Sequence, residues 1–142
     1  MSVMISNAVL EMTKQILADS LGIKESDISL HSYIKEDLGA ESIDFLDIFQ
    51  QAELKFGIRI DEGDLAPELR PPDDDEGWEV DINRELNEPE LEKLRSRLPE
   101  SVHERITPGL HVYEILGLIN VETLAGFFQQ KVSQKEAALA KS

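Results

Sequence analysis

The chain has 142 residues, a length that fits a single domain with a modest core. It carries 29 acidic residues against 14 lysines and arginines, a net charge of −15, which disfavours nucleic acid and anionic membranes as partners and favours proteins with basic surfaces. No cysteine is present, which excludes disulfides, thiolate metal sites and a cysteine nucleophile. Residues 1–10 lack the pattern of a signal peptide, and no stretch is apolar enough for a membrane span, so we expect a cytoplasmic protein.

The first half of the chain predicts two helices joined by a long loop. Apolar residues recur at helical spacing over residues 3–21, and Gly22 provides a stop. Residues 22–41 show no sustained period and predict a loop whose apolar side chains insert into a core. A second helix is expected from about Ser42 to Phe56, with Gly57 just past its end.

The second helix has two different faces. One arc is apolar and predicts a core face, and the opposite side is acidic. Between them lie Ile43, Leu46 and Leu54, which a helix in water would not leave exposed without a reason. The core arc consists of Phe45, Ile48, Phe49, Ala52 and Phe56, and the opposite side holds Asp44, Asp47 and Gln51.

The character of the chain changes after residue 65. Three prolines and the acidic run Asp73–Glu76 predict a loop or partly disordered segment over residues 66–87. Helical spacing returns over residues 88–98, and Ser101 with Glu104 has the spacing of a capping box. The last helix is expected to begin near Asn120, a favourable N-cap, and residues 133–142 are expected to fray. No alternating strand pattern is present, so the predicted fold class is all-α.

The stretch Glu36-Asp37-Leu38-Gly39-Ala40-Glu41-Ser42-Ile43-Asp44 places a serine at the start of an amphipathic helix, shortly after a glycine. Unpaired backbone N–H groups and the positive end of the helix dipole favour a phosphate at such a position, and the glycine permits a tight loop. The alternative interpretation is that the serine is only an N-cap, which is the usual role of serine at a helix start.

This stretch resembles the acyl carrier protein signature, Asp-Leu-Gly-x-Asp-Ser-Leu-Asp, whose serine carries 4′-phosphopantetheine. Asp37, Leu38, Gly39, Ser42 and Asp44 match it, whereas Glu41 and Ile43 replace the usual Asp and Leu. Residues 3–65 and 117–132 resemble the carrier core. The resemblance implies an acyl-carrier-like four-helix bundle in a single monomeric domain, with residues 66–116 as a helical or loop insertion before the last helix.

The resemblance also implies a carrier rather than an enzyme. A phosphopantetheinyl transferase would attach the arm of coenzyme A to Ser42, with Asp37 and Gly39 beside it, and the thiol of the arm would carry acyl groups in fatty acid, polyketide or related lipid biosynthesis. Acyl-loading and acyl-processing enzymes with basic patches would be the other partners. The expected partner-binding residues are Glu41, Ile43, Asp44, Leu46, Asp47 and Glu53.

Two alternatives for the function stay open at this point. One is a peptidyl or aminoacyl carrier, which the acidic second helix disfavours. The other is an unmodified interaction protein that keeps the carrier fold and uses the insertion as its binding surface. In the family the acyl chain lies between the helices, so Phe45, Phe49, Ala52 and Phe56 could line an acyl pocket, which the three rings would make bulkier than usual and so limit the chain length. The alternative that these residues are ordinary core is favoured, because aromatic side chains often fill cores.

No catalytic or metal-binding pattern is visible. The run Asp73–Glu76 fails as an EF-hand loop, because Trp78 falls where the turn glycine belongs. His31, His103 and His111 lie far apart and have no ligand spacing. For the insertion, we expect residues 88–106 to bury Leu91, Leu94, Leu98 and Trp78 against exposed apolar residues such as Leu54, and residues 70–80 to form a flexible acidic loop.

Overall fold

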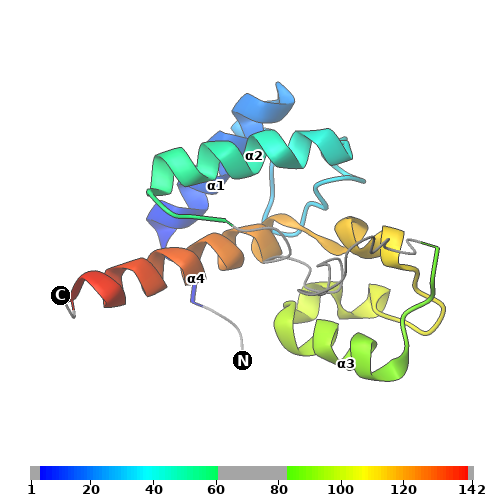
Figure 1. The fold of residues 1–142 in the computed structure, drawn as a ribbon. Coiled ribbons are helices and arrows are strands. Elements are labelled where there is room, and N and C mark those ends of the chain that lie inside the picture. Colours follow the sequence, from blue (N-terminus) through cyan, green and yellow to red (C-terminus); the bar gives the residue numbers. More distant parts are fainter. Residues whose placement is uncertain (1–3, 61–82, 141–142) are drawn as a thin grey trace, which may run out of the picture. The chain divides into compact units, whose positions relative to one another are not determined.

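The computed structural model describes residues 4–60 and 83–140 (Figure 1). Within these ranges the regular structure is helical, which confirms the predicted all-α class. The chain forms two compact units, the first from residues 1–60 with 119–142 and the second from residues 61–118. The predicted insertion, residues 66–116, lies inside the second unit. The two stretches that resemble the carrier core, residues 3–65 and 117–132, belong mostly to the first unit.

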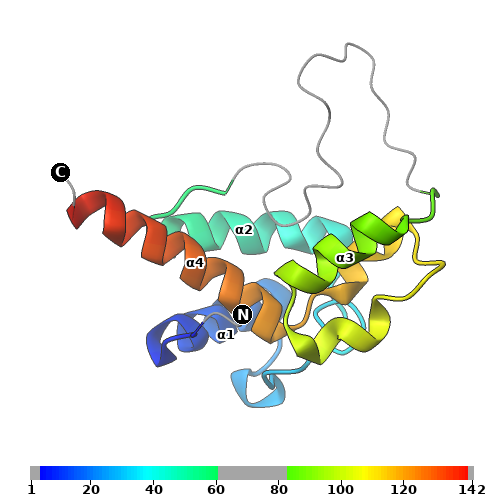
Figure 2. The ribbon, with the colours of Figure 1, turned by 90° about the horizontal axis from the view of Figure 1, so that it is seen from below.

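Three long helices and one short one form the first unit. They are α1 (Asn7–Leu21), the 3-10 helix η1 (Glu25–Asp27), α2 (Ser42–Phe56) and α4 (Val121–Ala140). Figure 2 shows α4 passing beside α1 and α2. Among the described residues, no helix combines the length and apolarity needed to cross a bilayer.

Helix α1 begins later than the sequence pattern predicts. The Ser6 hydroxyl accepts a hydrogen bond from the Val9 N–H at 3.2 Å, and extended backbone at Ser6 makes it the N-cap. Gly22 ends the helix in the left-handed conformation, as predicted. The buried stripe of α1 consists of Val9, Thr13, Ile16 and Leu17.

The core of the first unit forms where α1 packs directly against both α2 and α4. Each fully buried large apolar side chain in such a core contributes roughly 1.5–3 kcal/mol through removal of its surface from water. The buried side chains of α2 are Phe45, Ile48 and Ala52, and those of α4 are Val121, Thr123, Leu124, Ala125 and Phe128.

Backbone hydrogen bonds tie the long loop before α2 to the start of α4. The Ile34 N–H donates to the Ile119 carbonyl at 3.0 Å, and the Val121 N–H donates to the Ser32 carbonyl at 2.9 Å. A third bond joins the Glu122 N–H to the Leu30 carbonyl, also at 2.9 Å. These bonds fix the loop, and Ile28, Tyr33, Ile34 and Ala40 are consequently buried, as expected for a loop that inserts side chains into a core.

Helix α4 starts as predicted and ends later than predicted. The buried Asn120 side chain accepts hydrogen bonds from the N–H and the hydroxyl of Thr123, at 2.9 and 2.7 Å, which is N-cap geometry. Residues 133–140, expected to fray, continue the helix to Ala140. This stretch is rich in alanine, lysine and glutamate, which favour helix, and Lys135 Nζ donates to the Phe56 carbonyl at 3.1 Å.

The described part of the second unit contains α3 (Glu88–Arg97) and the 3-10 helices η3 (Glu100–Arg105) and η4 (Val112–Leu118). The capping box of α3 pairs Asn87 with Glu90, and the Glu90 carboxylate also accepts from both terminal nitrogens of Arg84 at 2.8 and 3.0 Å. The predicted capping box at Ser101 is wrong, because η3 begins one residue earlier and Ser101 lies inside it.

The expected packing of the 88–106 segment against Leu54 joins the two units and stays a prediction. Leu91 and Leu94 are buried and Leu98 is half-buried, but Leu54 is 85% exposed because it lies on the face of α2 that points away from the core. Trp78 and the acidic residues 73–76 lie outside the described residues.

Glu90 provides a test of the second unit. The hydrogen bonds from Arg84 hold the pKa of Glu90 below its usual range, so its stabilising effect is present above the unfolded-state pKa and is lost as pH falls through the lower folded-state value. We expect Glu90→Gln to lower the free energy of unfolding by about 1 kcal/mol at neutral pH, with the difference from wild type closing at an acidic pH below the folded-state pKa of Glu90. Urea unfolding followed by circular dichroism measures this, and an equal difference at both pH values would contradict the assignment.

Candidate functional site

Ser42 is the first residue of α2, in the position that the sequence predicted for it. The loop before it turns at Gly39, whose φ of 76° lies in the left-handed region. After this turn the Ala40 N–H donates to the Ile34 carbonyl at 3.1 Å and the Ala40 side chain is buried. The backbone of Glu41 is extended and Glu41 is the N-cap of α2. The loop therefore sets the position of Ser42 at the start of the helix.

The carboxylate of Asp37 closes this loop. It accepts a hydrogen bond from the Tyr33 N–H at 2.8 Å, while the Asp37 N–H donates to the Tyr33 carbonyl at 2.9 Å. The two signature residues Asp37 and Gly39 therefore have clear roles in the shape of the loop. A direct role for them toward the attached group stays a prediction.

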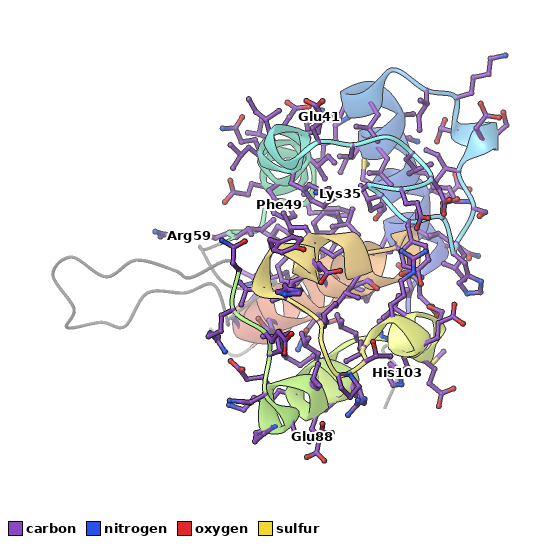
Figure 3. All side chains as sticks on the ribbon, turned by 90° about the vertical axis from the view of Figure 1, so that its right-hand side faces the viewer. Lys35, Glu41, Phe49, Arg59, Glu88 and His103 are labelled. Carbon is purple, nitrogen blue, oxygen red and sulfur yellow. The ribbon has the colours of Figure 1, made fainter. Side chains whose placement is uncertain are left out.

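The first turn of α2 is stabilised by acidic side chains. The Glu41 N–H donates to Asp44 Oδ2 at 2.7 Å, and the Asp44 N–H donates to the Glu41 carbonyl at 3.0 Å. Asp44 is half-buried, whereas Glu41 is exposed and lies on the outer side of the start of α2 (Figure 3). Carboxylates in the first turn also interact favourably with the helix dipole.

The helix start is chemically suited to a phosphodiester on Ser42. Helix α2 has 15 residues, so its N-terminus offers the aligned N–H groups and partial positive charge that favour an anion. Ser42 is also the only serine, threonine or tyrosine between Tyr33 and Ser96, which leaves one hydroxyl nucleophile in this part of the chain. The neighbouring carboxylates of Glu41 and Asp44 would repel the negative charge of the phosphodiester, and the helix dipole partly offsets this repulsion.

The predicted partner-binding residues share the outer face of α2. Ile43 and Leu46 are 68% and 64% exposed, and Asp47, one turn after Ile43, is also exposed. Glu53, at the other end of the helix, is half-buried, and its carboxylate accepts from the Ile60 N–H at 3.0 Å. Glu41, Ile43, Leu46 and Asp47 therefore form one accessible surface beside Ser42, and Glu53 also stabilises the segment after α2.

Asp47 has partners that the sequence did not reveal. The pKa of Asp47 lies below its usual range. The Ser20 hydroxyl of α1 makes the largest contribution to this shift, and the Gln51 side-chain amide makes the next largest. Gln51 Nε2 donates to Asp47 Oδ2 at 2.9 Å, whereas Ser20 Oγ is buried and makes no hydrogen bond of ordinary geometry. Ser20 lies on another helix and has no motif of its own, so only the packing of α1 on α2 identifies it.

The predicted pocket residues lie on the inner side of α2. Phe45 and Ala52 are buried, and Phe49 and Phe56 are half-buried. Figure 3 shows Phe49 on the side of α2 that faces α4. The rings of Phe49 and Phe56 contact Phe127 and Phe128 of α4, which the sequence identified only as part of an apolar helix face.

Each of the three histidines has a contact of its own. His31 pairs with Glu122 at 3.6 Å, His103 Nε2 contacts the Leu98 carbonyl at 2.9 Å, and His111 Nδ1 contacts Glu114 at 3.0 Å. In residues 4–60 and 83–140, no three acidic or histidine side chains are grouped so that they could hold a metal ion.

Comparison with known proteins identifies the family of the chain. The family described as "Phosphopantetheine attachment site" matches residues 13–69, a range that includes Ser42 and all of α2. An acyl carrier protein of Thermotoga maritima is 33% identical over 57 residues, which are 40% of this chain and 70% of that protein. The chain belongs to the acyl carrier protein family.

Other acyl carrier proteins are similar over the same part of the chain. That of Nitratidesulfovibrio vulgaris is 33% identical over 66 residues, or 46% of this chain and 87% of that protein. That of Cyanophora paradoxa is 36% identical over 59 residues, or 42% of this chain and 57% of that protein. No solved structure is significantly similar to the chain.

Gly39 and Gly126 allow a matched test of the loop before Ser42. An added Cβ would meet no atom within 4 Å at Gly39, so the cost of Gly39→Ala comes from the left-handed backbone, and we expect a loss of about 1 kcal/mol in unfolding free energy. Gly126 lies inside α4, where a Cβ would meet only Ile5 Cδ1 at 4.0 Å, so Gly126→Ala should stabilise by roughly 0.5–1 kcal/mol. Urea unfolding of both variants measures the difference, and changes of the same sign would contradict it.

Proposed function

We propose that this protein is a non-catalytic carrier that holds acyl groups as thioesters on a 4′-phosphopantetheine arm attached to Ser42. The supporting observation is the position of Ser42 at the start of α2, inside the range matched by the phosphopantetheine attachment family. In the loading reaction, the serine oxygen attacks the pyrophosphate of coenzyme A and forms a phosphodiester with the arm. A P–O bond of the pyrophosphate breaks, adenosine 3′,5′-bisphosphate leaves, and the serine proton passes to solvent. The chain has no cysteine, so the thiol that carries the cargo belongs to the arm.

The partners of this carrier are a phosphopantetheinyl transferase and enzymes that load and process its acyl group. Exposed carboxylates of Glu41 and Asp47 flank the exposed side chains of Ile43 and Leu46. A basic patch on the partner would complement the acids, and the apolar side chains would contact it after the encounter. The net charge of −15 would accelerate association with such basic surfaces. We place the carrier in the cytoplasm, in fatty acid, polyketide or related lipid biosynthesis.

The first test is the intact mass of the protein after incubation with coenzyme A and a broad-specificity phosphopantetheinyl transferase. We expect wild type and Ser96→Ala to gain one phosphopantetheine unit and Ser42→Ala to gain none. Ser96 is a suitable control because it is an exposed serine on α3. Failure of wild type to gain mass with several transferases, or a gain by Ser42→Ala, would overturn the proposal.

The acidic surface is tested by the rate of loading. Asp47→Asn and Glu41→Gln should each lower kcat/KM of the transferase by roughly fivefold at low ionic strength, mainly through KM, since exposed ion pairs contribute about 1 kcal/mol or less. The loss should shrink at about 0.5 M salt, where screening is strong. Glu11→Gln, an exposed acid on α1, is the control and should load like wild type. Equal losses in all three variants would show that only total charge matters.

A further inference from the structure

All five phenylalanines of the chain form one continuous row between α2 and α4. On α2 the ring centroids of Phe45 and Phe49 are 6.2 Å apart, and Phe49 is 6.5 Å from Phe127 of α4. Phe127 is 5.9 Å from Phe128, which is in turn 5.5 Å from Phe56 at the end of α2. These separations are those of aromatic rings in contact. We call this set the phenylalanine row.

The row occupies the space between two helices that do not approach each other closely. Helix α1 packs directly against both α2 and α4, whereas the ring contacts bridge α2 and α4. Phe128 and Phe45 are buried, and the rings of Phe49, Phe56 and Phe127 reach the edge of this interface half-buried. The row therefore extends from the interior to the surface, along the side of α2 that lies opposite the partner-binding face.

Two lysines of α4 strengthen the same interface. Lys135 Nζ donates to the Phe56 carbonyl at 3.1 Å and so ties the end of α2 to the last turns of α4. Lys131 Nζ lies 5.9 Å from the centroid of the Phe127 ring, within the range of a cation–π contact. Separating α2 from α4 would break these contacts together with those between the rings.

We propose that the phenylalanine row keeps the aliphatic part of the cargo out of the first unit, so that the carrier serves short or polar acyl groups. This inference rests on the proposed attachment at Ser42. A methylene chain needs carbon-to-carbon distances of about 3.5–4 Å on each side, so it could enter between α2 and α4 only by separating rings that now touch. A long tail that stays outside remains in water, which is unfavourable for each added methylene.

The proposal reverses the expectation that Phe45, Phe49, Ala52 and Phe56 line an acyl pocket. The half-buried ring of Phe49 contacts Phe127, and Ala52 and Phe128 are fully buried, so the rings occupy the space between α2 and α4. The aromatic side chains are thus the feature of this chain that sets the size of the cargo, because they fill the inner side of α2 with rings rather than with flexible aliphatic groups.

The test compares the acetyl, octanoyl and myristoyl forms of the full-length protein, prepared with a transferase from the corresponding acyl-coenzyme A. Intact mass first establishes that loading has occurred; absence of loading would reject the proposed function and not this inference. We expect Tm to agree within about 1 °C among the three loaded forms, while retention on a phenyl column increases with chain length. A Tm that rises with chain length, with constant retention, would show that the tail is buried and would overturn the inference.

Substitution of Phe49 tests whether the phenylalanine row is what excludes the acyl tail. Phe49→Ala removes the ring that meets Phe127, so the octanoyl form of this variant should exceed its acetyl form in Tm by about 4 °C or more. Leu54→Ala, on the exposed face of the same helix, is the control and should behave like wild type. If Phe49→Ala does not fold, Phe49→Leu replaces it, and the wild-type series alone still decides the main question. A folded Phe49 variant without any dependence on chain length would reject the row as the barrier.

Discussion

The first unit depends on three backbone hydrogen bonds between the loop before α2 and the start of α4. They join Leu30, Ser32 and Ile34 to residues 119–122, two parts of the chain that are separated in sequence by the whole second unit. Ile34 in turn accepts the hydrogen bond of Ala40, after the left-handed turn at Gly39. The geometry at Ser42 is consequently set by residues far away in sequence, and the short signature around the serine is only the last part of this arrangement.

Charge has two distinct functions around the site. Asp37, Asp44 and Glu53 use their carboxylates to accept backbone N–H groups, so they stabilise the loop, the first turn of α2 and the segment after it. Glu41 and Asp47 are exposed and remain available for encounter with a basic partner. The outer face of α2 thus carries acids and exposed aliphatic side chains, to which the proposed function assigns recognition, while the inner face carries the phenylalanine row.

The sequence predicted those features that depend on local patterns. The bounds of α2, the N-cap at Asn120 and the position of Ser42 follow from helical periodicity and capping chemistry. The prediction for Ser101 failed because η3 begins one residue earlier than the spacing suggested, and that for residues 133–140 failed because the helix continues to Ala140, where Lys135 contacts the Phe56 carbonyl. For the phenylalanine row, the sequence predicted only the apolar faces of the two helices. The contact between the rings of α2 and those of α4 could not be predicted, because it depends on tertiary packing and not on a local pattern.

In the proposed function, a prebuilt scaffold presents Ser42 and the attached group stays outside it. Amide NMR spectra of the protein before and after loading with phosphopantetheine are the decisive measurement. We expect shift changes confined to the loop from Gly39 and the first two turns of α2, with the amides of Ile34, Val121 and Phe128 unchanged. Large changes at those three amides would contradict it, because they would show that the attached group enters or rearranges the core.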